Sequence, residues 1–266
     1  MKRAIVIGAQ GFVGSAFVRC LKQRPLEVIE VTRQSYARHA GTGADVVIQA
    51  ACNSRKYLAD EDPVGEFDSS VRLCLQALKD FPTPLNVHIS SADVYADLAN
   101  PCATSEESPI DAGRISHYGL HKLLAEELVR HYAGRWLIAR LAGMVGPGLR
   151  KNPVFDVLND RPLRIHPDSQ YQFAATDLVA ETVWRLVEAG EANQVFNVCG
   201  RGLVSPRQVA ELAGRKLDLS LVPSDARPRI MDVNIGKISR RAEVPLSLDT
   251  VRAFVAGYPA AKPVPA

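Results

Sequence analysis

The sequence predicts an α/β protein built on a doubly wound parallel sheet, with a small α/β lobe toward its C-terminal side. Short apolar runs alternate along the chain with longer runs in which apolar residues recur every three or four positions. The short runs are typical of strands buried on both faces, and the longer runs of helices that cover a sheet. Because the links between the runs are short, we expect right-handed crossovers between parallel strands.

The first 147 residues contain a regular succession of these elements. We expect strands at residues 4–7, 26–31, 45–48, 86–89 and 136–141, and helices at residues 12–21, 67–81 and 116–132. The connection from Thr32 to Asp45 is too short to hold a helix, a strand and a second helix. The third strand that is usual in such sheets is therefore expected to be reduced or missing.

Shorter elements follow residue 147 and predict a second unit at residues 148–258. We expect helices at residues 152–159, 177–189, 205–216 and 248–256, and strands at 163–165 and 195–198, with some segments returning to the main sheet. Such a lobe usually closes over the ligand crevice at the carboxyl ends of the strands. The Pro- and Ala-rich segment 259–266 is expected to be a flexible tail.

The composition is typical of a globular cytoplasmic protein. Of the 266 residues, 47% are hydrophobic and 23% are charged, and 32 Lys and Arg against 29 Asp and Glu give a net charge of +3. This near balance disfavours a nucleic-acid-binding protein, and no apolar run is long enough to span a bilayer. The five dispersed cysteines favour reduced thiols over disulfides, and no ligand spacing indicates a metal. No Ala-x-Ala-like site follows the N-terminus, so no signal peptide is expected.

The first motif with chemical content is a glycine-rich turn between the first strand and the first helix. Gly8 allows a tight turn, Gly11 lets the backbone approach a pyrophosphate at the helix N-terminus, and Gly14 lets the helix pack on the strand. A glycine-rich turn without a ligand is the alternative. The position of the motif between a strand and a helix favours dinucleotide binding.

Two further motifs lie near the expected carboxyl edge of the sheet. Tyr118 and Lys122 are four residues apart and so share one helix face, where the ammonium would favour the phenolate and prepare the phenol for proton exchange. A solvated helix face is the alternative. Ser91 ends a central strand, where a hydroxyl can hold a substrate oxygen against the phenol. The alternative for this segment is an ordinary turn or helix cap.

In this order and spacing, the three motifs resemble the extended short-chain dehydrogenase/reductase superfamily, in particular its nucleotide-sugar epimerase/dehydratase/reductase branch. The resemblance covers nearly the whole chain and includes Ala50-Ala51 and the segment from Arg140 to Gly148. It implies a Rossmann-type sheet and an NAD(P) cofactor. The cofactor-binding residues that it implies are Gly8, Gln10, Gly11, Phe12, Val13, Gly14, Ala50, Ala51, Ser90, Tyr118, Lys122 and Leu141.

The resemblance also implies catalytic roles. Ser91 would polarise a substrate oxygen, Tyr118 would be the acid/base, and Lys122 would bind the nicotinamide ribose and tune the phenol. A positively charged oxidised nicotinamide would lower the phenol pKa further. Asp93 is either a second acid/base or a brace for the following loop. The implied substrate-binding residues are Ser91, Ala92, Asp93, Tyr118, Gly143 and Asn152.

Two departures from the family pattern narrow the activity. Ala92 stands where sugar 4,6-dehydratases carry an Asp, which disfavours water elimination. Gly143 replaces an Asn that contacts substrate in many members. Contacts to the substrate pyrophosphate are then expected from the backbone or from residues such as Arg150, Lys151 and Asn152.

The histidines lack a metal-ligand pattern. His88 falls in a core strand, and His166 precedes a proline in a loop. His117 and His121 flank Tyr118, and we interpret both as exposed residues on the helix face rather than as cleft residues.

The end of the second strand predicts a preference for NADP(H) over NAD(H). The position where an NAD-specific site carries an acid is Thr32, and Arg33 follows it. A guanidinium at this place suits a ribose 2′-phosphate, and Arg38 would add to its field. Glu30 lies inside the strand and is not expected to reach the ribose. The alternative is a solvated Arg33 and a site that accepts either cofactor.

These inferences predict an NAD(P)-dependent reductase of a ketosugar nucleotide. The alternatives are a nucleotide-sugar epimerase with transient oxidation and a non-catalytic NAD(P)-binding regulator. The helix from Ser116 carries Leu120, Leu123, Leu124 and Leu128, more apolar surface than one sheet contact needs. In the resembled family this helix and its neighbour form a dimer interface, so a homodimer is expected. The alternative is that these leucines all belong to the intramolecular core.

Overall fold

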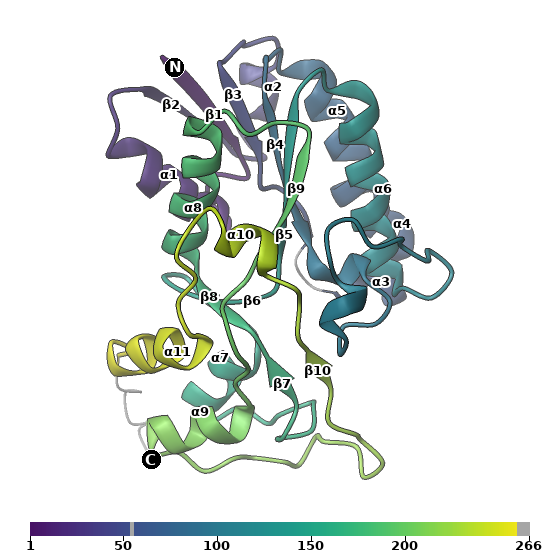
Figure 1. Cartoon of the computed structure of the whole chain (residues 1–266), viewed down its shortest axis with the longest axis vertical. Coiled ribbons are helices and arrows are strands. Elements are labelled where there is room, and N and C mark those ends of the chain that lie inside the picture. Colours follow the sequence, from purple (N-terminus) through teal and green to yellow (C-terminus); the bar gives the residue numbers. More distant parts are fainter. Residues whose placement is uncertain (54–55, 260–266) are drawn as a thin grey trace.

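The computed structural model describes residues 1–53 and 56–259 and contains a six-stranded, all-parallel sheet (Figure 1). The strand order is β2-β1-β3-β4-β5-β9. The strands are β1 (Arg3–Ile7), β2 (Glu27–Val31), β3 (Val46–Gln49), β4 (Asn86–Ser91), β5 (Trp136–Leu141) and β9 (Gln194–Val198). The doubly wound α/β fold predicted from the alternating runs is confirmed.

Helices cover both faces of this sheet, as Figure 1 shows. α1 (Gly14–Lys22) and α8 (Thr176–Glu188) pack together on one face, and α5 (Leu73–Asp80) and α6 (His117–Tyr132) on the other. Alternate residues of β1 divide between these two layers: Val6 packs with the α1 and α8 side, and Ile5 with the α5 side. Because both faces of these strands are buried, their sequences are almost continuously apolar.

The third strand usual in such sheets is missing, as the short connection predicts. Between β2 and β3 the described chain forms only the four-residue helix α2 (Tyr36–His39), and β1 lies between these two strands. Tyr36 packs edge-on against Phe81 and its hydroxyl donates to Asp80 Oδ2 (3.0 Å). These contacts pack α2 against the C-terminal end of α5.

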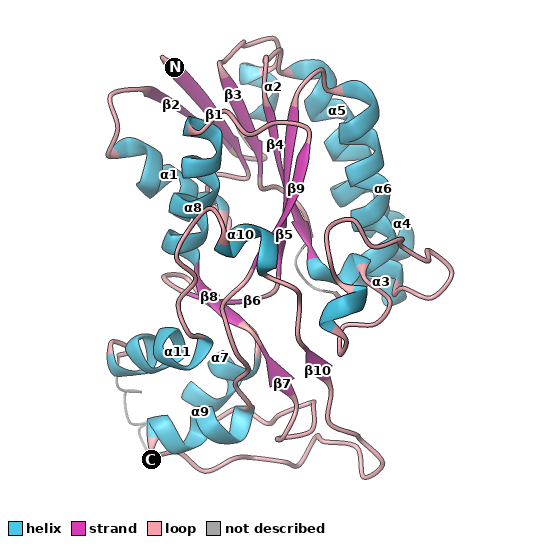
Figure 2. Cartoon of the chain, in the orientation of Figure 1, coloured by secondary structure: helices cyan, strands magenta, loops and turns pink. Residues whose placement is uncertain are grey.

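A small lobe extends from the carboxyl ends of the strands (Figure 2). It contains the helices α7 (Pro153–Leu158), α9 (Pro206–Ala213) and α11 (Ser247–Ala256), which share one apolar core. Two two-stranded parallel sheets connect it to the main sheet: β6 (Gly143–Val145) with β8 (Phe173–Ala175), and β7 (Gln170–Tyr171) with β10 (Ile230–Met231). α8 and β9 return to the main sheet, and α10 (Gly236–Ser239) packs beside β9.

Three expectations about local structure are wrong. Residues 163–165 are not a strand: Leu163 is buried, but its amide donates to the Asp218 carbonyl of a neighbouring loop (2.9 Å). The helix expected to reach residue 216 ends at Ala213, because Gly214 adopts a left-handed conformation (φ 61°). The helix expected at 67–81 is interrupted: α4 (Pro63–Phe67) passes into a π-helical turn, Asp68–Arg72, before α5 begins.

Three short helical segments complete the described elements. They are α3 (Leu58–Glu61), a 3₁₀ turn at Ala92–Val94 directly after β4, and a second 3₁₀ turn at Pro101–Ala103, where the Pro101 carbonyl accepts from Asn234 Nδ2 (3.2 Å). Of the tail expected at 259–266, residues 260–266 lie outside the described residues. No helix in the described part of the chain is long and apolar enough to cross a membrane.

Candidate active site

The glycine-rich turn has the geometry that its spacing predicts. Gly8 adopts φ +82°, and a Cβ on it would lie 2.7 Å from the Ala51 amide nitrogen. A Cβ on Gly14 would lie 2.1 Å from the Gly8 carbonyl oxygen, so α1 can pack this closely on β1 only with glycine there. Gly11 closes the turn by donating its amide to the Gly8 carbonyl (2.8 Å).

This turn leaves backbone donors available for an anion. Within residues 1–53 and 56–259, the amides of Gln10, Phe12 and Val13 have no hydrogen-bond acceptor, and Val13 precedes the first residue of α1 without a side-chain cap. Unpaired amides at a helix N-terminus form a site for phosphate groups. The donors and the glycine cradle together fit the pyrophosphate of a dinucleotide.

The other implied cofactor residues surround this turn or lie deeper in the sheet. Ala51 packs directly against Gly8 at the end of β3, and Ala50 donates its amide to Ile7. Leu141 ends β5 and is buried. The Ser90 hydroxyl donates to Glu126 Oε1 (2.6 Å) inside the core, so its side chain is occupied by a structural contact.

Ser91 and Asp93 form one unit at the carboxyl end of β4. Ser91 Oγ donates to Asp93 Oδ2 (2.6 Å) and accepts from the Asp93 amide (3.2 Å). The Lys56 ammonium, from the loop after β3, forms an ion pair with the same carboxylate. Burial alone would raise the Asp93 pKa, but the Lys56 ammonium and the Ser91 hydrogen bond hold it below its ordinary value. Asp93 is therefore ionised at neutral pH. Ala92, between them, is fully buried.

Tyr118 and Lys122 meet above the end of β4. They lie one turn apart on α6, which Ser116 caps by accepting the Gly119 amide (3.1 Å). Lys122 Nζ lies 5.8 Å from the centroid of the Tyr118 ring and donates to the Ile89 carbonyl on β4 (3.4 Å). The exposed fractions are 7% for Tyr118 and 2% for Lys122, which excludes a solvated helix face.

The net direction of the phenol pKa shift is opposite to the expected one. Burial raises the Tyr118 pKa well above its ordinary value, and Lys122 offsets only part of that rise. Cys52, Asp93 and Glu66 raise it further. Burial alone would lower the pKa of Lys122, but Cys52, Tyr118 and Glu66 raise it, so Lys122 is firmly protonated. In this structure the phenol is therefore protonated at neutral pH.

The end of β2 presents an unpaired guanidinium. Arg33 is exposed and, among the described residues, makes no hydrogen bond or ion pair. The turn that carries it is fixed by Thr32, whose amide donates to Ser35 Oγ (3.0 Å). Glu30 instead forms an ion pair with Lys22 of α1 (2.6 Å), in accord with the expectation that it does not reach the ribose. Arg38 is exposed on α2.

Two residues expected to contact substrate have backbone roles in the lobe. Gly143 lies in β6 so close to β8 that a Cβ would lie 2.5 Å from the Gln172 carbonyl oxygen. Asn152 caps α7, accepting the Phe155 amide (2.9 Å) and donating to the Met144 carbonyl (2.8 Å). These contacts account for a glycine at position 143 and an asparagine at position 152 without any role in substrate binding.

The two histidines beside Tyr118 differ from each other. His117 is exposed and pairs with Asp60 of α3 through Nδ1 (2.9 Å), as an exposed helix-face residue should. His121 is buried and binds Glu66 of α4, so the expectation of exposure is wrong for it. His88 is enclosed in the core, and burial lowers its pKa to about 3. No group of three or more potential ligands in residues 1–53 and 56–259 is arranged to hold a metal.

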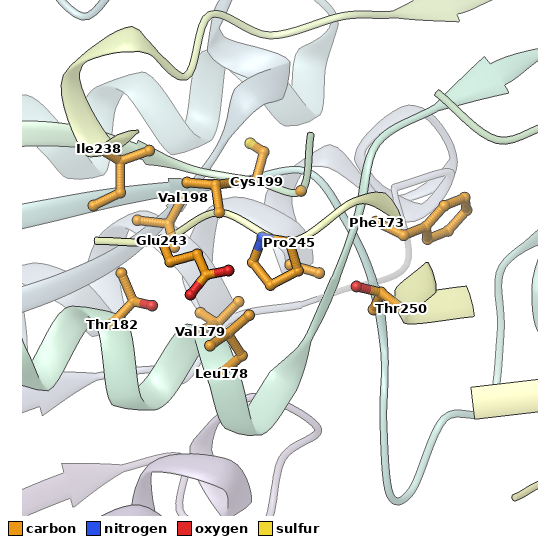
Figure 3. Close-up of a pocket in the computed structure, with 13 residues that line it drawn as sticks. Phe173, Leu178, Val179, Thr182, Val198, Cys199, Ile238, Glu243, Pro245 and Thr250 are labelled. Carbon is orange, nitrogen blue, oxygen red and sulfur yellow. The ribbon is translucent and has the colours of Figure 1, made fainter. Parts of the chain in front are cut away.

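Figure 3 shows a cavity that lies outside this site. It encloses about 20 Å³ between α8, the end of β9 and the segment before α11, and its walls are mainly apolar. This volume holds about one water molecule. None of the residues expected to bind cofactor or substrate lines it.

Sequence reasoning missed Lys56, Cys52 and Glu66, which all act on the Tyr118–Lys122 couple or on Asp93. Cys52 and Lys56 follow β3 in a segment without periodicity, so no pattern identifies them. Glu66 had a signal: it lies just before an apolar helical stripe and one turn before Ser70.

Comparison with known proteins identifies the family. The model of the NAD dependent epimerase/dehydratase family matches residues 4–60 and 40–199. GDP-6-deoxy-D-mannose reductase from Pseudomonas aeruginosa is 28% identical over 161 residues, which are 54% of this chain and 53% of that protein. The match thus spans about half the length of this curated relative.

Solved structures show the same fold over almost the whole chain. A UDP-galactose 4-epimerase superposes with a TM-score of 0.77 at 24% identity, covering 95% of this chain and 97% of that one. RMD from Pseudomonas aeruginosa in complex with NADPH gives a TM-score of 0.78 at 21% identity, covering 96% and 98%. The chain belongs to the NAD dependent epimerase/dehydratase family.

Proposed function

We propose that this protein is an NADP(H)-dependent reductase of a nucleotide-activated ketosugar, with Tyr118 as the proton donor. The observation that carries the proposal is the buried Tyr118–Lys122 couple beside Ser91, at the carboxyl end of β4. Open α/β sheets bind their ligands at this edge. Membership of the family and the reductase from Pseudomonas aeruginosa support the class of substrate.

Each residue then has one task in the reaction. The Tyr118 phenol donates its proton to the ketone oxygen as the carbinol forms, and Lys122 binds the ribose while its charge stabilises the phenolate left behind. Ser91 orients the ketone oxygen. When bound, the reduced nicotinamide supplies the hydride to the carbonyl carbon. In the opposite direction the Tyr118 phenolate accepts the carbinol proton and becomes the phenol again.

The sequence relative supports a reductase over an epimerase, because a GDP-6-deoxy-D-mannose reductase matches this chain at 28% identity over 161 residues. The raised pKa of the Tyr118 phenol agrees with a group that donates its proton. The epimerase is the second candidate, supported by the fold that this chain shares with UDP-galactose 4-epimerase. A non-catalytic regulator would have no need for the complete Ser, Tyr and Lys set.

Arg33 supports the choice of cofactor. Its guanidinium follows the strand position where NAD-specific sites carry an acid, and it has no partner within the described residues. A 2′-phosphate would supply one through charge-assisted hydrogen bonds.

A homodimer through α5 and α6 completes the proposal. Leu120, Leu124, Leu128 and Tyr132 recur every four residues along α6, and Leu124 and Tyr132 are 37% and 45% exposed. An exposed apolar row of this kind fits an interface between copies of the chain.

A substrate panel tests the proposed function. The protein is incubated with NADP⁺ and GDP-6-deoxy-D-mannose, and separately with UDP-galactose, while nicotinamide absorbance and sugar products are followed. A reductase, working in its oxidative direction, forms NADPH with the first compound. Conversion of UDP-galactose to UDP-glucose without net NADPH formation would support the epimerase instead. Cofactor binding without any turnover across a wider panel of sugar nucleotides would support the regulator.

A further inference from the structure

A carboxylate is enclosed behind the catalytic face of α6. Glu66 lies on α4 with no exposed side-chain surface, and it accepts hydrogen bonds from the Ser70 hydroxyl and the His121 ring nitrogen Nδ1. An ionised carboxylate only accepts, so His121 is the donor through Nδ1–H. Burying a carboxylate is costly unless such partners satisfy it.

The Glu66–His121 pair joins α4 to α6, the helix that carries the predicted catalytic residues. His121 lies between Tyr118 and Lys122 on α6. Glu66 lies one residue before the end of α4, and Ser70 belongs to the π-helical turn that follows. α3, α4 and this turn all pack against α6. A π-helical turn inside a helix is a common feature of functional sites.

The charge of Glu66 acts on both members of the couple. It raises the pKa of Tyr118 and that of Lys122, in each case after larger effects from burial and nearer groups. Since solvent does not reach the carboxylate, its field is only weakly screened.

We propose that Glu66 and His121 are positioning residues for the Tyr118–Lys122 couple, fixing α6 against the π-helical turn and placing one enclosed carboxylate behind the phenol and the ammonium. This inference rests on the proposed function for the meaning of the couple. It adds to the candidate active site two residues that would touch neither the sugar nor the nicotinamide. Their role is to hold α6, and with it the phenol and the ammonium, in place with an enclosed carboxylate nearby.

Other charged groups face the same region from each neighbouring element. α3 contributes Asp60, which pairs with His117 on the first turn of α6. The loop after β3 contributes Cys52 and Lys56, and the 3₁₀ turn after β4 contributes Asp93. Asp68 and Arg72 in the π-helical turn pair with each other at the surface. The His117–Asp60 pair is the matched control, because it joins α6 to α3 with both side chains 68% exposed.

The test measures phenol ionisation without turnover. The chain is labelled with ¹³Cζ-tyrosine, saturated with NADP⁺ and titrated with alkali, and Tyr118→Phe assigns the Tyr118 signal. Glu66→Gln removes the carboxylate and should lower the ionisation midpoint of the phenol by about 0.5–1 pH unit. Asp60→Asn should leave the midpoint unchanged.

Two further variants keep the test decisive. The double variant E66Q/H121Q replaces the pair with two amides that can bond to each other, so it tests the charge if E66Q alone fails to fold. His121→Gln retains the carboxylate and should not lower the midpoint. An unchanged midpoint in E66Q, or in the double variant, would overturn the electrostatic part of the proposal.

The positioning part is measured as a split between kinetic constants in the assay that succeeds in the substrate panel. E66Q and H121Q should each lower kcat roughly 10-fold, while KM for the sugar nucleotide changes less than about 3-fold, because small displacements reduce catalysis more than binding. D60N should change neither constant. Equal kcat in wild type and E66Q would refute this part. If no sugar nucleotide turns over, the proposed function fails, but the phenol midpoint still decides whether Glu66 acts on Tyr118.

Discussion

Ser91 Oγ donates its only hydrogen to Asp93 Oδ2 across 2.6 Å, so the hydroxyl expected to polarise a substrate oxygen is already engaged. The same carboxylate pairs with Lys56, and its pKa is held below the ordinary value despite burial. Asp93 is thus an ionised acceptor for the Ser91 hydroxyl, and we propose that it serves as a brace rather than as a second acid/base. A ketone oxygen must compete with Asp93 for that hydrogen.

This relationship predicts different losses for two substitutions at the end of β4. Ser91→Ala should lower turnover by about 10²-fold, because an oriented donor is lost. Asp93→Asn should cost less than about 10-fold, since the amide oxygen still accepts from Ser91 and no proton passes through residue 93. Steady-state kcat of both variants, with circular dichroism as a check on folding, is the measurement. A loss above about 10²-fold in a folded Asp93→Asn protein would make Asp93 a second acid/base.

Arg33→Ala should weaken NADPH binding by about 10-fold or more and leave NADH binding nearly unchanged. The reason is the loss of a charge-assisted bond to the 2′-phosphate, which NADH lacks. Fluorescence titration with both cofactors measures the two dissociation constants. Arg38→Ala should weaken NADPH binding less than Arg33→Ala, because this arginine lies on α2 beyond the turn and only adds to the field of Arg33. Equal or tighter binding of NADH than of NADPH by the unmodified protein would overturn the cofactor assignment.

Glu126 predicts a pH-dependent loss of stability. It is buried against Arg140, with Nη2–Oε2 at 2.7 Å and Nε–Oε1 at 3.0 Å. Burial alone would raise its pKa, but Arg140, Ser90 and Arg130 bring it below the ordinary value. A carboxyl with a depressed pKa stabilises the fold above its unfolded-state value and loses that contribution as pH falls through the folded-state value.

Denaturant unfolding should therefore show a steeper loss of stability in acid for wild type than for Glu126→Gln. At neutral pH the Gln variant should be less stable by about 3–5 kcal/mol, since Arg140 keeps its buried charge without a counter-ion. The exposed pair Arg252–Asp249 supplies the control, and Asp249→Asn should leave the unfolding midpoint almost unchanged. Parallel pH profiles for wild type and Glu126→Gln would contradict this interpretation.

Leu124→Glu should convert a dimer into a monomer without unfolding it. Leu124 lies in the exposed apolar row of α6, and a carboxylate there would be desolvated in an interface between two copies. Light scattering at micromolar concentration gives the mass of both proteins. A monomeric mass for the unmodified protein would show that this row serves another purpose.

Most of the fold was predictable because its signals are local. The buried strand at residues 4–7 and the helix at residues 116–132 follow directly from the apolar runs and their spacing. The missing third strand follows from the length of one connection. The error at residues 163–165 has a simple cause: three apolar or long residues resemble a strand, but the hydrogen bond from Leu163 to the Asp218 carbonyl does not extend into a strand ladder among the described residues.

The shared helix face of Tyr118 and Lys122 was predictable, but the electrostatics of this couple and the neighbours that set them were not. Spacing places Tyr118 and Lys122 on one face, whereas the sign of the phenol pKa shift depends on burial, Asp93 and Glu66. The burial of His121 depends on Glu66, which is 55 residues away in the chain. The periodicity of a helix describes that helix alone. It cannot show which side chain of another helix contacts it.

The most direct test of the central claim is a comparison of wild type with Tyr118→Phe in NADP⁺ reduction with GDP-6-deoxy-D-mannose, together with NADPH binding by fluorescence. The substitution removes one hydroxyl and keeps the buried ring beside Lys122. We expect an unchanged NADPH dissociation constant and a turnover lowered by ~10²–10⁴-fold, the usual contribution of a positioned acid/base. Wild-type turnover in a folded Tyr118→Phe protein would contradict the account.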